Sequence, residues 1–459
     1  MSYKSLEEKI QAHGGNAVDM MQNAQTGRYE FPVPPQFTNW MEEQRAWRES
    51  VALMDQSFHM TDLYVSGPDT IRLLSDLAVN SFAKFGRDKA KQIVCCNHEG
   101  YVIGDAIVFG LEDDQVNVVG RPVVPSWIQY QAEIGGYNVT VERDQRTLEN
   151  PDKPRKTYRY EIQGPDALKL LEKVNEGGAL TTKFFNMGEI TIAGCKARTL
   201  THGMGGEQGL ELWGPFEEGR KVKDALIEAG KEFGLRRVGA RAYSSAAAES
   251  GWVPSPLPAI FTGKGMKEYR EWLGGNSFEA VSSLGGSFAP ENVEEYYFTP
   301  WDLDYGRVVK FDHDFIGREA LEKMADGPHR RKMTLVWNRD DVLKVFGGMM
   351  DDADLPAKYM EMPAAHYATH PYDRVLVDGR DVGVSISPVY SANERAWISL
   401  AILDGDAAET GAQVTVIWGE PNGGTTKPNV EPHRQMEVRA EVHPWPIHEA
   451  SRKFYRAQT

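Results

Sequence analysis

The stretch TYRYEIQGPDALKLLEKV (157–174) decides the fold class. Its first seven residues predict a strand, Gly164-Pro165 predicts a turn, and the leucines that follow have helical spacing. The same order occurs earlier, because MTDLYVSG (60–67) predicts a strand and Pro68 to Leu77 predicts a helix. Two strand, Gly-Pro, helix units indicate related halves within one α+β region.

Neighbouring segments extend this region with elements of both kinds. YVIGDAIVFG (101–110) and DQVNVVG (114–120) are separated by about one turn, which favours a β-hairpin. We predict helices over 124–137, ending at a Gly-Gly pair, and over the amphipathic stretch 217–234. Helical spacing is also present over 40–53. The first part of the chain is therefore expected to mix helices with antiparallel strands.

The composition changes at DGPHRRK (326–332), so we expect two regions, 1–330 and 331–459. Residues 341–370 of the second region have no clear periodicity and are expected to be helical or irregular. The rest of this region consists of short strand-like runs separated by Gly, Asp and Pro turns. These runs are MTLVWN (333–338), RVLVDGRDVGVSIS (374–387), RAWISLAIL (395–403), AQVTVIWG (412–419) and QMEVRAEV (435–442). Such spacing predicts a small antiparallel barrel or jelly roll.

Charge and composition narrow the class of protein. The 459 residues carry a formal net charge of −15, which argues against a nucleic-acid partner because phosphate binding needs a basic face. The first 15 residues are polar and no apolar run approaches the roughly 20 residues that cross a bilayer. Three cysteines cannot form a disulfide framework. We therefore expect a cytoplasmic protein that acts on small molecules, without a membrane, a metal or a protein partner.

Several segments resemble the aminomethyltransferase (T-protein) family of the glycine cleavage system, and they occur in the family's order along nearly the whole chain. They are Gln163-Gly164-Pro165, GEQGLELWGP (206–215), AYSSAAAESGW (242–252), KFDHDFIGREALEK (310–323) and GVSISPVYSANERAWISLA (383–401). This resemblance implies a folate-binding α+β fold, with several lobes around a central channel and a C-terminal β-barrel or jelly-roll module.

A narrower resemblance is to the tetrahydrofolate-dependent aryl O-demethylases of lignin-degrading bacteria. MDQSFHMTDLYV (54–65), SGWVPSPLPAIFTG (250–263) and GGTTKPNVEPHRQMEVRA (423–440) are similar to segments of that subgroup. It implies transfer of a methyl group from a methoxylated aromatic acid to tetrahydrofolate, giving 5-methyltetrahydrofolate and a phenol. Syringate is favoured as substrate, with vanillate and 3-O-methylgallate as alternatives.

The chemistry of this reaction explains which catalytic residues the resemblance selects. The leaving group is a phenoxide, so a tyrosine hydroxyl, whose pKa is near ~10, is a suitable donor to the departing oxygen. The resemblance assigns this role to Tyr243. His59, in SFHM, is a candidate for orienting the phenolic oxygen or the substrate carboxylate, and Arg121 is a candidate for pairing with that carboxylate. Each also has a purely structural interpretation, as a core or surface residue.

Four residues are candidates for binding the folate. A carboxylate can accept two parallel hydrogen bonds from a pterin, and Glu211 is the candidate for this. Gln163 is expected to help hold the folate, and Trp252 to form a wall of its pocket. Asp105 aligns with the acidic position of the T-protein, but Gly104 stands where that family has a second acid, so we expect Asp105 to have a changed or structural task.

Four further residues are expected to line the substrate pocket. The pocket residues are Tyr29, Phe31, Gln56 and Met60. Phe31 stands where vanillate-type relatives have a tyrosine, and this less polar wall favours a substrate with a second methoxy group.

Two other functions remain open for the chain. The alternatives to an O-demethylase are an aminomethyltransferase that acts on a lipoylated carrier, and a folate-binding module without catalysis. Release of ammonia, or folate binding without turnover, would identify each of them.

Overall fold

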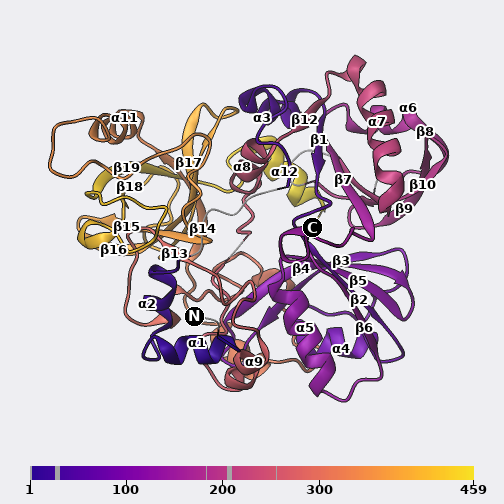
Figure 1. Ribbon diagram of the computed structural model, residues 1–459, viewed down its shortest axis with the longest axis horizontal. Coiled ribbons are helices and arrows are strands. Elements are labelled where there is room, and N and C mark those ends of the chain that lie inside the picture. Colours follow the sequence, from indigo (N-terminus) through magenta and orange to yellow (C-terminus); the bar gives the residue numbers. More distant parts are fainter. Residues whose placement is uncertain (1–2, 26–31, 182, 204–208, 255, 459) are drawn as a thin grey trace.

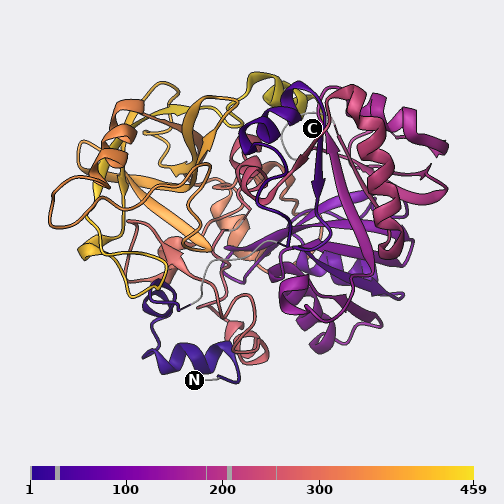
Figure 2. The ribbon, with the colours of Figure 1, turned by 45° about the horizontal axis from the view of Figure 1, so that its top comes forward.

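The computed structural model describes residues 3–25, 32–181, 183–203, 209–254 and 256–458. Its described strands form three sheets. Figures 1 and 2 show two of these sheets packed together on one side of the molecule and the third, formed by later residues, on the other side. Helix α8 (Ala240–Ser250) lies between the two sides and contacts α3 on one side and strands of the third sheet on the other.

The first sheet has five strands in the order β3-β4-β5-β2-β6. Its strands are β2 (Thr61–Ser66), β3 (Ala90–Cys96), β4 (Val102–Glu112), β5 (Gln115–Gly120) and β6 (Thr140–Asp144). The hairpin predicted over 101–120 is present as β4 and β5, which pair antiparallel. Helices α4 (Thr70–Leu77) and α5 (Val123–Ile134) contribute Leu73, Leu74 and Trp127 to the main hydrophobic core of this part.

The second sheet has seven strands in the order β12-β1-β7-β11-β10-β9-β8. Its strands are β1 (Ala52–Asp55), β7 (Thr157–Gln163), β8 (Asn175–Ala179), β9 (Met187–Ile192), β10 (Cys195–Thr201), β11 (Gly209–Pro215) and β12 (Arg236–Val238). Helices α6 (Ala167–Val174) and α7 (Gly219–Gly230) pack on one face of it. The part of 40–53 that begins at Ala52 is strand rather than helix, and α3 (Trp40–Glu49) ends before it.

Both Gly-Pro turns predicted from the sequence are present, and both need their glycine. Gly67 has φ +138° and Gly164 has φ +127°. Residues that carry a Cβ rarely adopt such positive φ angles. A Cβ on Gly164 would lie 2.4 Å from the carbonyl oxygen of Ser50, and one on Gly67 would lie 2.4 Å from that of Asn138. Each glycine thus lets the backbone of a segment remote in sequence, at Ser50 or at Asn138, pass close to the turn.

Alternation along β7 gives the second sheet one apolar and one polar face. Tyr158, Tyr160 and Ile162 belong to the core that the leucines of α6 also form. Successive side chains of a strand point to opposite faces, so Arg159, Glu161 and Gln163 point away from these helices. All three are buried. Together with Glu211 of β11, which pairs with Glu161, they form what we call the polar face.

The third sheet closes into a barrel. Its order is β13-β15-β16-β17-β14-β19-β18, and β18 pairs back with β15. Its strands are β13 (Leu284–Gly285), β14 (Arg331–Trp337), β15 (His370–Val377), β16 (Arg380–Ser391), β17 (Ala396–Leu403), β18 (Gln413–Trp418) and β19 (Met436–His443). The run 374–387 spans parts of two strands, β15 and β16, because Asp378 and Gly379 form a turn inside it.

The remaining helices connect these sheets. They are α1 (Leu6–Ala12), α2 (Ala17–Gln22), α9 (Met266–Trp272), α10 (Arg318–Met324), α11 (Arg339–Gly348) and α12 (Glu449–Gln458). Short 3-10 helices occur at Thr147–Glu149, Phe216–Glu218, Lys231–Phe233, Val293–Tyr296, Gly306–Val308 and Pro421–Gly423. In both overall views α12 lies beside α3 and α8. Of the helices in the described ranges, none combines the length and apolarity that a bilayer span requires.

Candidate functional site

Tyr243 and His59 meet at the centre of the molecule. Tyr243 lies in the first turn of α8, and its phenol oxygen is 3.0 Å from Nε2 of His59. The side-chain amide of Gln56 donates to the same oxygen at 3.4 Å. Gln56 and His59 lie in the turn between β1 and β2, so this contact joins the second sheet, the first sheet and α8. The sequence-predicted donor, orienting histidine and glutamine are thus brought together.

The start of α8 is fixed by α3. The carboxylate of Glu43 accepts hydrogen bonds from the backbone N–H of Gly239, at 2.8 Å, and from the N–H groups of Phe37 and Thr38. Gly239 is the residue before α8, where backbone N–H groups have no partner within the helix. Glu43 therefore satisfies a donor at the end of α8 that carries Tyr243.

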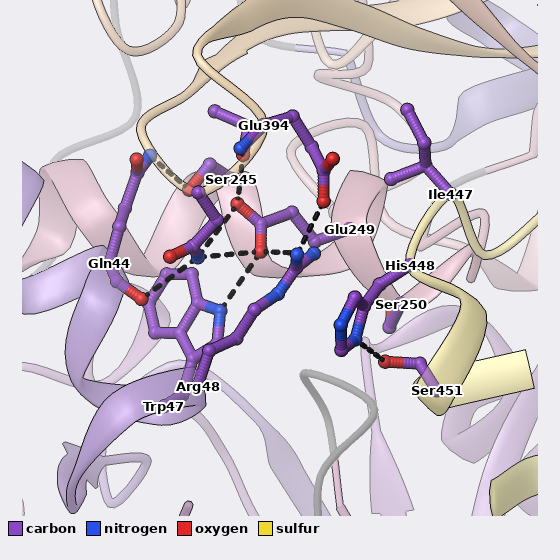
Figure 3. Close-up of polar contacts among 12 residues, drawn as sticks. Gln44, Trp47, Arg48, Ser245, Glu249, Ser250, Glu394, Ile447, His448 and Ser451 are labelled. Atoms are coloured by element: carbon purple, nitrogen blue, oxygen red, sulfur yellow. Dashed lines mark hydrogen bonds and ion pairs between the residues drawn. The ribbon is translucent and has the colours of Figure 1, made fainter.

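A buried carboxylate holds the other end of α8. Glu249 accepts hydrogen bonds from Trp47 of α3 at 3.0 Å, from Ser391 at 2.5 Å and from Asn393 at 2.9 Å. Arg48 of α3 pairs with it at 3.1 Å and also with Glu394. Figure 3 shows Glu249 at the centre of these contacts.

Two more contacts complete this cluster. Gln44 of α3 donates to Ser245 of α8 at 2.7 Å and accepts from the N–H of Ala392 at 2.7 Å. His448 lies on the side of the cluster opposite Gln44, and its Nδ1 atom is 3.0 Å from the Oγ atom of Ser451. We call Gln44, Trp47, Arg48, Ser245 and Glu249 the α8 clamp. The clamp fixes the helix that carries Tyr243 against both α3 and the turn between β16 and β17.

Electrostatics around Tyr243 keep both rings neutral. Burial, followed by the positive charges of Arg121, Arg146 and other arginines, lowers the pKa of His59 to about 3. Burial raises the pKa of Tyr243 above its ordinary value, and the negative charges of Glu161 and Glu211 add to the increase. The positive charge of Arg121 acts on both groups, because it lowers the pKa of His59 and opposes the rise in the pKa of Tyr243. At neutral pH the site presents a protonated phenol, a neutral imidazole and a nearby cation.

The polar face of the second sheet carries a buried charge network. Arg159 pairs with Glu211 and, at 3.1 Å, with Asp62 of the first sheet. His202, directly after β10, has Nε2 at 2.7 Å from Glu211 and 3.3 Å from Glu161. Burial would raise the pKa of Glu211, but Arg159 and His202 lower it to about 2. Glu211 is therefore a firmly ionised acceptor, as the assignment of a pterin to it requires.

Asp105 and Trp252 form a third group. The indole N–H of Trp252 donates to Asp105 at 3.2 Å, and the amide of Gln92 donates to the same oxygen at 2.7 Å. Burial raises the pKa of Asp105 above its usual value. Lys332 of β14 lies near enough to interact electrostatically with Asp105, and burial lowers the pKa of Lys332 to about 7. The two residues that we expected separately, at a folate wall and at a changed acidic position, are thus direct partners.

Of the four remaining predicted residues, two lie in the described part of the chain and two do not. Gln163, at the end of β7, is fully buried and its backbone pairs with Gly209 of β11. Met60 packs in a small cluster with Phe109 and Trp213. Tyr29 and Phe31 lie outside the described residues.

Three residues of the charge network were not predicted from the sequence: Arg159, Glu161 and His202. Strand alternation in TYRYEIQ (157–163) would have placed Arg159 and Glu161 beside Gln163, because these three occupy alternate positions of one strand. No local pattern indicates His202. It reaches Glu211 only because β10 and β11 are neighbours in the sheet.

Two carboxylates and one imidazole of this network also have the spacing of metal ligands. Glu161, His202 and Glu211 place one ligand atom each within 4.8 Å of one another. Such spacing can suit a metal ion, but here Nε2 of His202 faces both carboxylates directly and Arg159 adds a positive charge. Without an ion, a protonated His202 and the guanidinium of Arg159 would balance the charges of the two carboxylates.

Comparison with known proteins shows the family of the chain. The family model of the GCVT N-terminal domain matches residues 6–254. The chain is 48% identical over 453 residues to syringate O-demethylase from Sphingobium sp. (strain NBRC 103272 / SYK-6), and the match covers 98% of both chains. It is 29% identical to sesamin methylene transferase from Sinomonas sp. (strain No.22), over 84% of each chain.

A solved structure supports the fold. The glycine cleavage system aminomethyltransferase T from Bartonella henselae superposes with a TM-score of 0.62 at 16% identity, covering 93% of this chain and 95% of that one. The expected mixed α+β fold and its C-terminal barrel are therefore confirmed. With more than half of the chain matched by the family model and a near full-length relative at 48% identity, the chain belongs to the GCVT (glycine cleavage T-protein) family.

Proposed function

We propose that this protein transfers a methyl group from a methoxylated aromatic acid, foremost syringate, to tetrahydrofolate. The observation that carries the proposal is the partly buried contact between Tyr243 and His59, 3.0 Å apart, together with an ionised carboxylate, Glu211, whose charge acts on Tyr243. The similarity to a syringate O-demethylase, over nearly the whole of both chains, supports the same reaction and substrate class. Vanillate and 3-O-methylgallate are the other substrates to be tested.

Tyr243 has the properties of the donor to the leaving oxygen. Cleavage of the aryl ether leaves electrons on the phenolic oxygen, and a hydrogen bond from a neutral phenol stabilises that charge. The raised pKa of Tyr243 keeps its proton in place at neutral pH. Neutral His59 holds the phenol oxygen in position without competing as an acid, because the pKa of His59 is lowered to about 3.

Arg121 is the residue that binds the carboxylate of the arene in this proposal. His59 is neutral and cannot balance a negative charge, whereas an arginine remains charged and can make two parallel hydrogen bonds to a carboxylate. The charge of Arg121 acts on both Tyr243 and His59, which supports a substrate whose carboxylate pairs with Arg121 while its methoxy group faces Tyr243.

Glu211 is the proposed partner of the pterin ring. A carboxylate offers about four acceptor positions, and Arg159 and His202 occupy two of those on Glu211, so two remain for N–H groups of a pterin. Gln163 lies on the same face, and Trp252 with Asp105 forms a further polar edge. Bound tetrahydrofolate supplies the nitrogen nucleophile that accepts the methyl group. The proton of that N–H balances the one that the released phenol gains.

The reaction is tested with purified protein, tetrahydrofolate and each methoxybenzoate under anaerobic conditions. We expect formation of 5-methyltetrahydrofolate and one equivalent of demethylated phenol, both measured by chromatography and mass spectrometry. Folate binding without product from any arene would refute the proposal and favour a binding module. Ammonia release from a lipoyl-bound aminomethyl group would favour an aminomethyltransferase. The packing at Gly104 weighs against the aminomethyltransferase. The T-protein family has an acid at this position, but here even a Cβ would lie 3.1 Å from the side chain of Val124.

We retain the expectation that the enzyme is cytoplasmic. Its three cysteines, Cys95, Cys96 and Cys195, are buried and unpaired with one another, which is compatible with a reducing compartment. Reduced folates are cytoplasmic cosubstrates in this proposal. A fractionation experiment with an antibody to the protein would test this expectation.

A further inference from the structure

We propose that His202 is a positioning residue for the folate, and that it acts as an imidazolium bridge between Glu161 and Glu211. This inference rests on the proposed function, because it assumes that tetrahydrofolate binds at the polar face. It concerns a residue that contacts the carboxylates and acts through them.

Glu161 and Glu211 are directly opposite each other on the antiparallel strands β7 and β11. Both side chains are almost completely buried, with exposed fractions of 0% and 3%. Like charges directly opposite on neighbouring strands repel each other, and burial strengthens the repulsion because little water screens it. Two ionised carboxylates at these positions therefore require a cation between them.

His202 is the side chain that lies between them. Leu200 of β10 pairs with Glu211, and His202, two residues further along the chain, points to the same side. Its Nε2 atom is 2.7 Å from one oxygen of Glu211 and 3.3 Å from one oxygen of Glu161. Ionised carboxylate oxygens only accept hydrogen bonds, so Nε2 must carry a proton, as it does in the imidazolium and in one of the two neutral tautomers.

The charges around His202 favour this protonated form. Burial alone would lower the pKa of His202, but the charge of Glu161 and the hydrogen bond and charge of Glu211 raise it to about 9. Arg159, also on β7, opposes the proton, but it is itself paired with Glu211 and Asp62. From α8, the neutral phenol of Tyr243 interacts with Glu161 and Glu211.

A bridge of this kind determines what the carboxylates can bind. The edge of a pterin that carries the 2-amino group and the ring N–H offers only donors, so both carboxylates must stay unprotonated to attract it. Without the imidazolium, two close carboxylates share a proton and one of them becomes a donor. That proton would repel the N–H edge of the pterin. His202 thus keeps the polar face in its accepting state at neutral pH.

The test is the pH dependence of folate binding. The dissociation constant of tetrahydrofolate is measured by anaerobic calorimetry from about pH 6 to about pH 8, for the wild type and for His202→Gln. We expect the wild-type constant to change less than about threefold. In His202→Gln, uptake of one proton by the carboxylate pair should weaken binding up to about tenfold per pH unit as the pH falls.

A matched control and a second measurement make the result decisive. His443→Gln removes another imidazole beside a glutamate, since His443 is 3.0 Å from Glu441 but 34% exposed and distant from the polar face. It should follow the wild-type profile. In the wild type, NMR of labelled histidine should find one imidazolium that persists above about pH 8, and this measurement does not depend on how the variant folds.

The two levels of the proposal can fail separately. If the wild type binds no tetrahydrofolate, the proposed function is wrong and the role of His202 is wrong with it. If the wild type binds tetrahydrofolate and His202→Gln has a parallel pH profile, only the role of His202 is overturned. Loss of every imidazolium signal below about pH 8 would also overturn that role.

Discussion

The phenol oxygen of Tyr243 and the Nε2 nitrogen of His59 lie 3.0 Å apart, and their rings meet edge to face with centroids separated by 5.1 Å. The contact joins the first turn of α8 to the turn between β1 and β2, two segments that are far apart in the sequence. Because both rings are neutral, the contact orients the phenol without removing its proton.

Replacing Tyr243 by phenylalanine should remove catalysis and preserve folate binding. The variant loses only the hydroxyl that stabilises the departing oxygen, and general-acid groups of this kind contribute about 10²–10⁴ in rate. We expect kcat to fall at least about 100-fold while the dissociation constant of tetrahydrofolate stays within about twofold. Tyr137→Phe, which removes a hydroxyl bonded to Asp76 outside the site, is the control. Near-normal turnover of Tyr243→Phe would show that another group assists the leaving oxygen.

The low pKa of His59 predicts a pH effect on stability. In the unfolded chain His59 gains a proton near its ordinary pKa of 6.5, but in the folded protein it does so only near 3. Between these values the unfolded state binds more protons, so the free energy of unfolding falls as the pH decreases, by up to about 1.4 kcal/mol per pH unit from this group. The difference between wild type and His59→Gln in urea unfolding, from about pH 6.5 to about pH 4.5, measures it. Parallel curves for the two proteins would mean that His59 is protonated in the folded state.

Arg121→Ala should weaken binding of the arene and leave the folate site intact. A lost charge-assisted pair costs about 1.5–3 kcal/mol, so the KM for syringate should rise about 10-fold to 100-fold. The methyl ester of syringate has no carboxylate charge and should lose less. Arg87→Ala removes an exposed arginine that pairs with Glu112 and should change neither value. Equal losses for the acid and the ester would place the substrate carboxylate elsewhere.

Removing Glu249 should loosen the α8 clamp. Glu249→Ala leaves Arg48 without one of its two carboxylate partners in a buried position, a type of change that costs about 3–5 kcal/mol in stability. We expect a reduced urea midpoint together with a lower kcat, because Tyr243 is carried by the same helix. Glu249→Gln retains an acceptor for Trp47 and should recover part of both. Glu449→Ala, at an exposed glutamate of α12, is the control. An unchanged kcat in a destabilised Glu249→Ala protein would separate the clamp from catalysis.

The parts of the fold that could be predicted are those with local signals. The two Gly-Pro turns, the hairpin of β4 and β5 and the barrel strands each have a short periodic pattern bounded by turn residues. Strand β1 could not be separated from α3 in this way, because it is only four residues long, ALMD, and is mostly apolar. Its place is set by pairing with β7 and, in parallel, with β12, which are remote in sequence.

The candidate site divides in a similar way. Tyr243, His59 and Gln56 are found through short motifs that resemble those of a family, and the structure brings these three side chains together. The bridge between Glu161 and Glu211 depends on the register of β7, β10 and β11, which no local segment encodes. Trp252 and Asp105 were both expected at the site, but their direct hydrogen bond depends on packing of the chain after α8 against β4.

The shared core of the barrel has a consequence for how the molecule comes apart. Tyr372, Val384, Ile386, Leu400 and Ile402 of the barrel strands pack in the same cluster as the first sheet and its helices. A fragment that stops near residue 330 would therefore leave apolar side chains uncovered, and so would its complement. The chain should melt in one cooperative transition, and a protease cut near residue 330 should not release a stable half. A destabilising substitution in the barrel, even far from the site, would thus lower methyl-transfer activity because it reduces the population of folded protein.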